Sequence, residues 1–299
     1  MDIGIIGLGK MGKNVAQNMM KNGYKVHAYN RTESVTDEVV AKGAKKVKEI
    51  EEFREQLARP RIIWVMLPSG DATEDMLRNL SSILEEGDIV IDGSNSFYKD
   101  SIRMHAMLRE KGIMFLDAGC SGGPSGALNG MSIMVGGEES AFRKMEELFK
   151  YLSVPNGYIY VGAPGSGHFV KMVHNAIEYG MMEAIAEGMD LVKNGPYKDI
   201  DLAGLCNAWN NGSVIEGRLI KLTQSALSKD GKLEKIVPYV EDTGEGRWSV
   251  QAAIEHGILF TAIASSLFER FSSRDSERFG KKLLAALRHE FGGHAVKEE

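Results

Sequence analysis

The chain has 299 residues, a formal net charge of −5 and 43% hydrophobic residues, which indicates a globular protein of about two domains and excludes a disordered or collagen-like chain. The acidic balance gives no general attraction to nucleic acid or to an anionic membrane, and no uncharged apolar run approaches the roughly 18 residues that span a bilayer. Two cysteines are too few for a disulfide framework or a cysteine-pair zinc site, and no secretory leader is visible, so we expect a cytoplasmic protein.

Short apolar runs alternate with amphipathic stretches in the first half of the chain. We predict strands at residues 3–6, 25–29, 62–66, 89–91, 114–116, 132–135 and 158–161. Strands that alternate with helices form right-handed βαβ units. We therefore expect a Rossmann-like, doubly wound α/β domain over residues 1–164, with a parallel sheet and helices on both faces.

A glycine-rich turn, GLGKMG, follows the first predicted strand and precedes a helix-like stretch. In such a turn Gly7 allows the tight bend, Gly9 lets the backbone approach a pyrophosphate, and Gly12 allows close packing of helix on strand. The pyrophosphate then lies at a helix N-terminus. We predict a dinucleotide site that includes the whole turn: Gly7, Leu8, Gly9, Lys10, Met11 and Gly12.

The end of the second predicted strand indicates which dinucleotide binds. Asn30, Arg31 and Thr32 stand there, where an NAD-binding domain places an acidic residue for the ribose 2′-hydroxyl. Arg31 can pair with a 2′-phosphate, and its neighbours can donate hydrogen bonds to it, which favours NADP. Glu33 follows directly and could be the acidic partner, so NAD is the alternative.

The ends of the third and fourth predicted strands complete the expected cofactor crevice. A Rossmann fold binds its ligand at this edge of the sheet, although such loops are also ordinary turns. We assign to this crevice Met66, Leu67, Pro68 and Asn95.

The second half of the chain has few strand signals. Helix-compatible stretches cover residues 168–194, 199–208, 215–225, 246–271 and 275–288, with turn-like breaks between several of them,. We predict an all-α domain over residues 165–299 that ends in a short tail.

The first of these helices carries the richest cluster of polar residues. Lys171, Asn175 and Glu178 are spaced at i, i+4 and i+7 and share one helical face, with His174 beside them,. A solvated ion pair is the alternative, but the glycine-rich junction before the helix favours a cleft. A lysine against a bound nicotinamide cation can act as a base near neutral pH. The other face is predicted to be core, through Phe169, Val173, Ile177 and Met181.

The segment CSGGP, from Cys120 to Pro124, ends the fifth predicted strand. Its backbone and the Ser121 hydroxyl could hold a substrate carboxylate or the lysine, and a turn that needs glycine is the alternative. Cys120 fits a small buried hydrophobe better than a nucleophile. The seven histidines show no metal-binding spacing, so we expect no metal.

These residues resemble the motifs of the 6-phosphogluconate dehydrogenase family. GLGKMG, NRT, DGSNS, SGGPSGA and above all GHFVKMVHNAIEYG look like that family's motifs. The resemblance continues through FER at residues 268–270 to RHEFGGH at residues 288–294, so it covers nearly the whole chain. The length is similar to that of the family's short-chain branch. The resemblance implies oxidative decarboxylation of 6-phosphogluconate to ribulose 5-phosphate and CO2 with NADP or NAD, in the pentose phosphate pathway.

The resemblance also implies a role for each matching residue. Lys171 would be the general base for the substrate's 3-hydroxyl, and Glu178 would protonate the enediol. The phosphorylated sugar acid would be bound by Asn95, Ser121, Gly122, Gly123, His174, Asn175, Tyr179 and Arg270. Arg288 and His294 of the tail would complete the partner's site in a homo-oligomer, a dimer or a tetramer. The phosphate-contacting lysine of long-chain members falls on Thr243, with Arg247 close by.

Two other functions compete with this interpretation. A β-hydroxyacid dehydrogenase for a small unphosphorylated acid shares the layout and a catalytic lysine, but would not need His294 or Glu178. A non-catalytic NADP-sensing module would keep the glycine turn and have no use for Lys171 facing Glu178.

Overall fold

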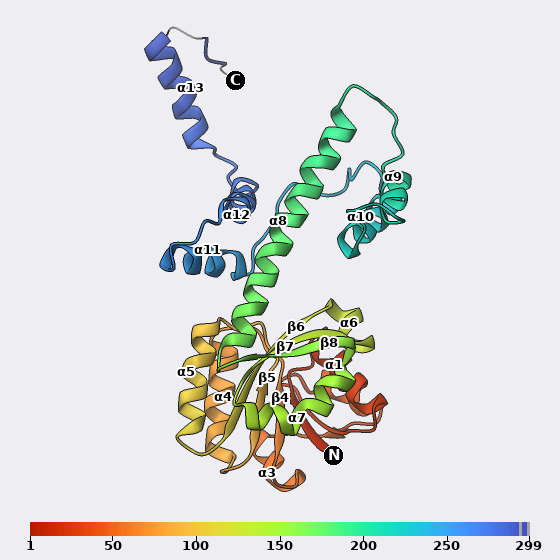
Figure 1. Ribbon diagram of the computed structural model, residues 1–299, viewed down its shortest axis with the longest axis vertical. Coiled ribbons are helices and arrows are strands. Elements are labelled where there is room, and N and C mark those ends of the chain that lie inside the picture. Colours follow the sequence, from red (N-terminus) through yellow and green to blue (C-terminus); the bar gives the residue numbers. More distant parts are fainter. Residues whose placement is uncertain (293–294, 298–299) are drawn as a thin grey trace. The chain divides into compact units, whose positions relative to one another are not determined.

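The computed structural model describes residues 1–292 and 295–297. It divides into two compact units, Met1–His174 and Asn175–Glu299, and the division falls inside the long helix α8 (Ser166–Asn194) (Figure 1). The domain boundary between residues 164 and 165 stays a prediction. Among the described residues, no helix combines the length and the apolar character that crossing a membrane requires.

The first unit is a sheet between two layers of helices. Its strands are β1 (Asp2–Ile6), β2 (Lys25–Tyr29), β3 (Lys45–Lys46), β4 (Ile62–Val65), β5 (Ile89–Asp92), β6 (Met114–Ser121), β7 (Met131–Gly137) and β8 (Ser153–Gly162). Its helices before α8 are α1 (Gly12–Lys21), α2 (Glu33–Val40), the 3-10 helix η1 (Ile50–Glu52), α3 (Phe53–Gln56), α4 (Asp71–Ile83), α5 (Tyr98–Arg109), α6 (Gly123–Asn129) and α7 (Glu139–Leu152). The strand order is β3-β2-β1-β4-β5-β6-β7-β8. The predicted Rossmann-like α/β class is confirmed.

Two details of the sheet differ from the prediction. β7 runs antiparallel to β6, so the sheet is mostly rather than wholly parallel. Only residues 122–130 connect these strands, and a parallel crossover needs a dozen or more residues. The short strand β3 was not predicted, because two lysines carry no apolar pattern.

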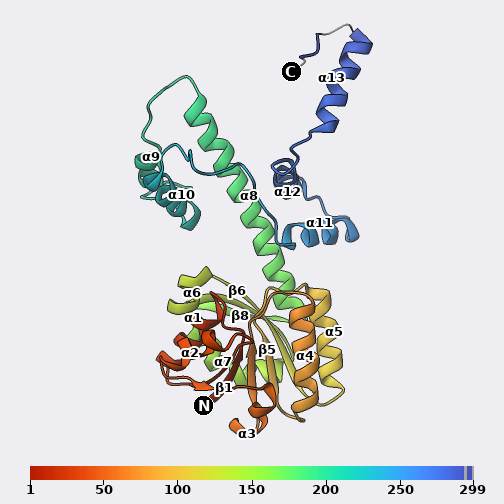
Figure 2. The same ribbon diagram turned by 180° about the vertical axis from the view of Figure 1, so that it is seen from behind.

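Alternate residues of the central strands enter two separate cores. Ile5 of β1 and Trp64 of β4 pack into the core beneath α1, α2, α6 and α7, whereas Ile6 and Val65 pack into the core beneath α3, α4 and α5. Figure 2 shows α4 and α5 on one side of the sheet and α1 and α7 on the other. Burial on both faces explains why these strands read as continuous apolar runs.

Every regular element among the described residues of the second unit is a helix. After α8 come α9 (Leu202–Trp209), α10 (Arg218–Lys229), α11 (Glu245–Glu255), α12 (Thr261–Ser272) and α13 (Phe279–Gly292). The single helix predicted over residues 246–271 was wrong. Gly257 adopts φ +62°, and the N–H of Ile258 donates to the carbonyl of Ala253 at 2.8 Å, which ends α11 with a left-handed glycine,.

The predicted core face of α8 was also wrong in part. The side chains of Ile177 and Met181 are 49% and 52% exposed, whereas Met172, Ala176 and Tyr179 are buried. Helical periodicity identifies the apolar stripe of a helix, but it does not tell which residues of that stripe are buried by other parts of the same chain.

Candidate active site

The glycine turn between β1 and α1 has the geometry of a dinucleotide site. Gly7 has φ +91°, and a Cβ at Gly7 or Gly12 would overlap a backbone carbonyl, of Met66 and of Gly7 respectively. A Cβ at Gly9 would meet no heavy atom within 4 Å. The first turn of α1 holds no acidic residue and its N-cap has no side-chain hydrogen bond, so the helix dipole favours an anion there. These features fit a pyrophosphate beside Gly9.

Asn30 orders this turn from the end of β2. Its Oδ1 accepts the N–H of Leu8 at 3.0 Å, and its Nδ2 donates to the carbonyl of Thr32 at 3.2 Å. Arg31 next to it is exposed. Glu33, which follows, is exposed and forms an ion pair with Lys46 at 2.6 Å.

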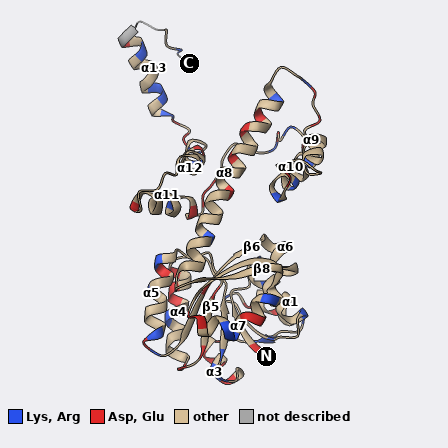
Figure 3. Cartoon of the chain, viewed as in Figure 1, with Lys and Arg blue, Asp and Glu red and all other residues tan. Residues whose placement is uncertain are grey.

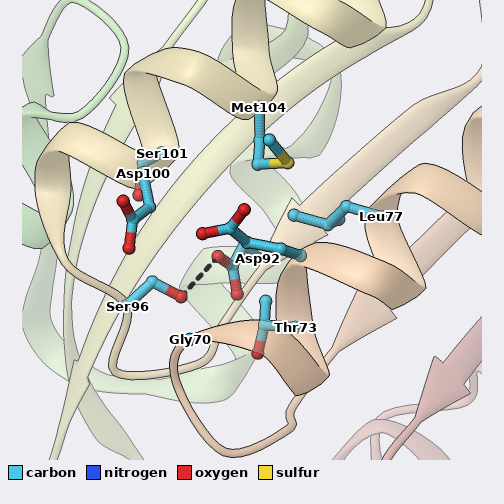
Figure 4. Close-up of a pocket in the computed structure, with 9 residues that line it drawn as sticks. Gly70, Thr73, Leu77, Asp92, Ser96, Asp100, Ser101 and Met104 are labelled. Atoms are coloured by element: carbon cyan, nitrogen blue, oxygen red, sulfur yellow. Dashed lines mark hydrogen bonds between the residues drawn. The ribbon is translucent and has the colours of Figure 1, made fainter.

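The loops after β4 and β5 are tied together at the same edge of the sheet. The N–H of Leu67 donates to Ser94 Oγ at 3.1 Å, and the N–H of Ser94 donates to Asp92 Oδ1 at 3.0 Å. Ser96 Oγ donates to the other carboxylate oxygen of Asp92 at 2.8 Å (Figure 4). Asp92 also lines a small pocket between α4 and α5. This network connects the two loops that contain the other residues predicted to line the cofactor crevice: Met66, Pro68 and Asn95.

Lys171 lies in a small polar cluster with His174 and Ser121. The Lys171 side chain is buried, its Nζ is 3.4 Å from His174 Nδ1, and His174 Nε2 is 3.2 Å from Ser121 Oγ. If the Lys171 amine donates to Nδ1, the His174 Nε2–H donates to Ser121 Oγ. Gly122 and Gly123 continue from Ser121 into α6. Next to Ser121, burial raises the pKa of the Cys120 thiol to about 12, which fits the expectation of an inert cysteine.

A second group of predicted site residues gathers within the second unit. Asn175 Nδ2 donates to Glu245 Oε1 at 3.1 Å, and Thr243 Oγ1 donates to Glu245 Oε2 at 2.6 Å. The N–H of Thr243 donates to the Tyr179 hydroxyl at 3.4 Å. The Arg270 guanidinium lies 3.5 Å from the centre of the Tyr179 ring. The structure therefore brings three predicted site residues together around Thr243 and the buried Glu245: Asn175, Tyr179 and Arg270. The sequence analysis did not single out Glu245, although it lies in the TGEGRW segment.

The other residues that the sequence analysis named for the site in this unit are Arg247, Glu178, Arg288 and His294. Arg247 binds Asp242 with two hydrogen bonds at 2.7 and 3.1 Å, and the hydrogen bond from Arg247 holds the pKa of Asp242 below its usual value, with help from Arg274. Arg247 is therefore committed to a carboxylate. Glu178 lies near the middle of α8, a helix along which several acidic residues are distributed (Figure 3). Arg288 is exposed on α13, and His294 lies outside the described residues.

Comparison with known proteins assigns the chain to a family. The family described as the NAD binding domain of 6-phosphogluconate dehydrogenase matches residues 2–162, and the family described as the 6-phosphogluconate dehydrogenase C-terminal domain matches residues 167–298. The chain belongs to the 6-phosphogluconate dehydrogenase family. The resemblance inferred from the motifs is thereby confirmed, and the first unit of this dehydrogenase contains the family's nicotinamide dinucleotide domain.

Individual relatives agree with this assignment. A Bacillus subtilis protein named provisionally as a 6-phosphogluconate dehydrogenase is 44% identical over 299 residues, 100% of each chain. The NAD(+)-dependent, decarboxylating 6-phosphogluconate dehydrogenase of Haloferax volcanii is 37% identical over 298 residues, 99% of this dehydrogenase and 98% of the relative. Plasmodium falciparum 6-phosphogluconate dehydrogenase, studied without ligand, with NADP+ and with 6-phosphogluconate, superposes with a TM-score of 0.86 at 32% identity over 100% of this chain and 66% of that one.

Proposed function

We propose that the enzyme converts 6-phospho-D-gluconate to D-ribulose 5-phosphate and CO2 while reducing NADP, as a step of the pentose phosphate pathway. The observation that carries this proposal is the buried Lys171, whose amine meets His174 beside Ser121. A buried lysine next to an imidazole can exchange a proton with substrate, because burial disfavours its charged form. A dinucleotide-sensing module would have no use for this cluster.

The chain's own residues then account for each proton transfer. Neutral Lys171 takes the proton of the 3-hydroxyl while the hydride leaves C3 for the bound nicotinamide, which supplies the electron acceptor. The resulting β-keto acid breaks its C1–C2 bond and releases CO2. Protonated Lys171 donates to the keto oxygen and so stabilises the enolate charge. Glu178 protonates the carbon that lost the carboxylate while Lys171 takes back the proton on the enediol oxygen, which completes the ketose.

The remaining predicted residues bind and orient the substrate. Ser121, Gly122 and Gly123 hold the end of the molecule that carries the carboxylate, Asn95 contacts substrate and cofactor, and His174 and Asn175 hold hydroxyl groups. Tyr179 and Arg270 bind the phosphate, with Arg288 and His294 contributed by a partner subunit. These assignments stay predictions, and so does the cytoplasmic location.

A homo-oligomer is part of the proposal. Large apolar side chains on three helices of the second unit are between 42% and 57% exposed, and exposed apolar side chains of this size favour burial against another subunit. They are Ile177, Met181, Met182, Phe268, Leu283, Leu284 and Leu287.

The proposed reaction is tested by absorbance at 340 nm. Purified enzyme with 6-phosphogluconate is expected to reduce NADP, with 3-hydroxyisobutyrate as the competing substrate and gluconate as the unphosphorylated control. Turnover of 3-hydroxyisobutyrate without turnover of 6-phosphogluconate would contradict the proposal and support a β-hydroxyacid dehydrogenase.

Replacement of Arg31 by alanine tests the choice of NADP. We expect the KM for NADP to rise about 10- to 100-fold and that for NAD to change little, because a charge-assisted pair with the 2′-phosphate is lost. Arg109→Ala, at an exposed position on α5, is the matched control. Equal rises for both dinucleotides would show that Arg31 does not read the 2′-phosphate.

A further inference from the structure

The first turn of α8 lies directly against the sheet, at three glycines. A Cβ at Gly119 of β6 would overlap Lys171 Cβ, and a Cβ at Gly167 of α8 would overlap the carbonyl of Asp117. A Cβ at Gly136 of β7 would lie 2.6 Å from the N of Gly167 and 2.7 Å from Asp117 Oδ1. Backbone therefore touches backbone here, and the helix that carries Lys171 has little room to move toward the strands.

Asp117 of β6 binds this turn through both carboxylate oxygens. Its side chain is fully buried, and it accepts the N–H of Gly165 at 2.8 Å on Oδ1 and the N–H of His168 at 2.8 Å on Oδ2. The first N–H groups of a helix have no partner within the helix. Asp117 thus caps α8 from a neighbouring strand. Burial raises the pKa of Asp117, whereas His168 and the two backbone N–H groups act in the opposite direction by stabilising the carboxylate, at the end of the helix dipole that favours negative charge.

His168 gives the same turn a second attachment. Its Nδ1 lies 2.7 Å from Ser101 Oγ of α5, and both residues are 1% exposed. The first turn is therefore fixed to β6 through Asp117 and to α5 through His168. Lys171 follows His168 by three residues, about one helical turn, so a shift of the first turn moves its amine as well.

We propose that Asp117 is a positioning residue for Lys171, which fixes the first turn of α8 and thereby the place of the reacting amine. The proposal rests on the proposed role of Lys171 as the general base. A displacement of about 1 Å at a reacting group can cost roughly 100-fold in rate. A carboxylate suits two converging N–H donors, whereas an asparagine would turn its own NH2 group toward one of them.

Two variants perturb this arrangement from different strands. Asp117→Asn replaces one acceptor by a donor, and Gly136→Ala pushes on Asp117 and on the backbone of α8 without removing a charge. Asp88→Asn is the matched control, because Asp88 is also fully buried and accepts two backbone N–H groups, of Arg61 at 2.7 Å and of Glu85 at 3.0 Å, away from α8.

The readout is the single-turnover rate constant at 340 nm, measured with enzyme at saturating concentration in excess over 6-phosphogluconate and with saturating dinucleotide, which does not depend on the fraction of folded enzyme. We expect Asp117→Asn and Gly136→Ala to lower it about 10- to 100-fold while the dinucleotide Kd stays within about twofold. Asp88→Asn should lower the melting temperature and leave the rate constant unchanged.

Three outcomes separate this proposal from the proposed function. Wild-type enzyme that does not oxidise 6-phosphogluconate would overturn the proposed function and the positioning role with it. Active wild type and an Asp117→Asn variant with the same rate constant would overturn the positioning role alone. If Asp117→Asn does not fold, Gly136→Ala decides, and a wild-type rate constant in that variant overturns the proposal.

Discussion

Replacement of Lys171 by methionine is expected to lower kcat about 10³- to 10⁴-fold. Methionine keeps most of the side-chain volume at a buried position but removes the amine that would take the 3-hydroxyl proton and return one to the keto oxygen. A positioned acid or base commonly contributes two to four orders of magnitude to a rate. Because the glycine turn does not depend on this side chain, the Kd for the dinucleotide should stay within about twofold.

The measurement is steady-state reduction of NADP at 340 nm, together with dinucleotide binding by fluorescence titration. Lys193→Met is the matched control, because Lys193 lies on the same helix and is exposed. That variant should retain wild-type kcat. More than about a tenth of wild-type activity in Lys171→Met would show that another group is the base.

The sequence predicted the parts of the fold that depend on local pattern. Burial of both faces of β1 and β4 produces continuous apolar runs,. The GLGKMG turn is recognised from the strand-like residues before it and the helix-like residues after it, and the structure requires glycine at Gly7 and Gly12,. The direction of β7 was not predicted, because the length of the connection rather than the strand's own residues decides it. The end of α11 at Gly257 was missed because the apolar periodicity continues across it.

In the candidate site too, local contacts could be predicted from the sequence and contacts between distant residues could not. Lys171 and His174 share a helix, so their proximity follows from spacing, but the contact of His174 with Ser121 joins residues 53 positions apart. Asp117 and Glu245 were missed for this reason. Each is a buried carboxylate in a stretch whose pattern indicates only a strand or a loop, and each accepts a hydrogen bond from a residue 48 or more positions away. No periodicity reports such contacts.

Replacement of Arg270 by methionine is expected to raise the KM for 6-phosphogluconate about 100-fold. The guanidinium lies 3.5 Å from the centre of the Tyr179 ring and donates to the carbonyl of Glu241 at 2.8 Å, so it is held in place before a substrate arrives. A preorganised arginine binds phosphate through charge-assisted hydrogen bonds with little further loss of side-chain entropy. Methionine can still pack on the Tyr179 ring but offers neither charge nor donors.

Comparison with gluconate distinguishes phosphate binding from a general loss of structure. Gluconate lacks the phosphate, so its kcat/KM should change less than about threefold in Arg270→Met, and the preference for 6-phosphogluconate over gluconate should fall by about two orders of magnitude. Arg143→Met, at an exposed position on α7, should leave that preference unchanged. An equal loss with both substrates would show that Arg270 supports the fold around Tyr179 and does not bind the phosphate. Other cations would then have to bind the phosphate. One candidate, Arg247, already forms an ion pair with Asp242.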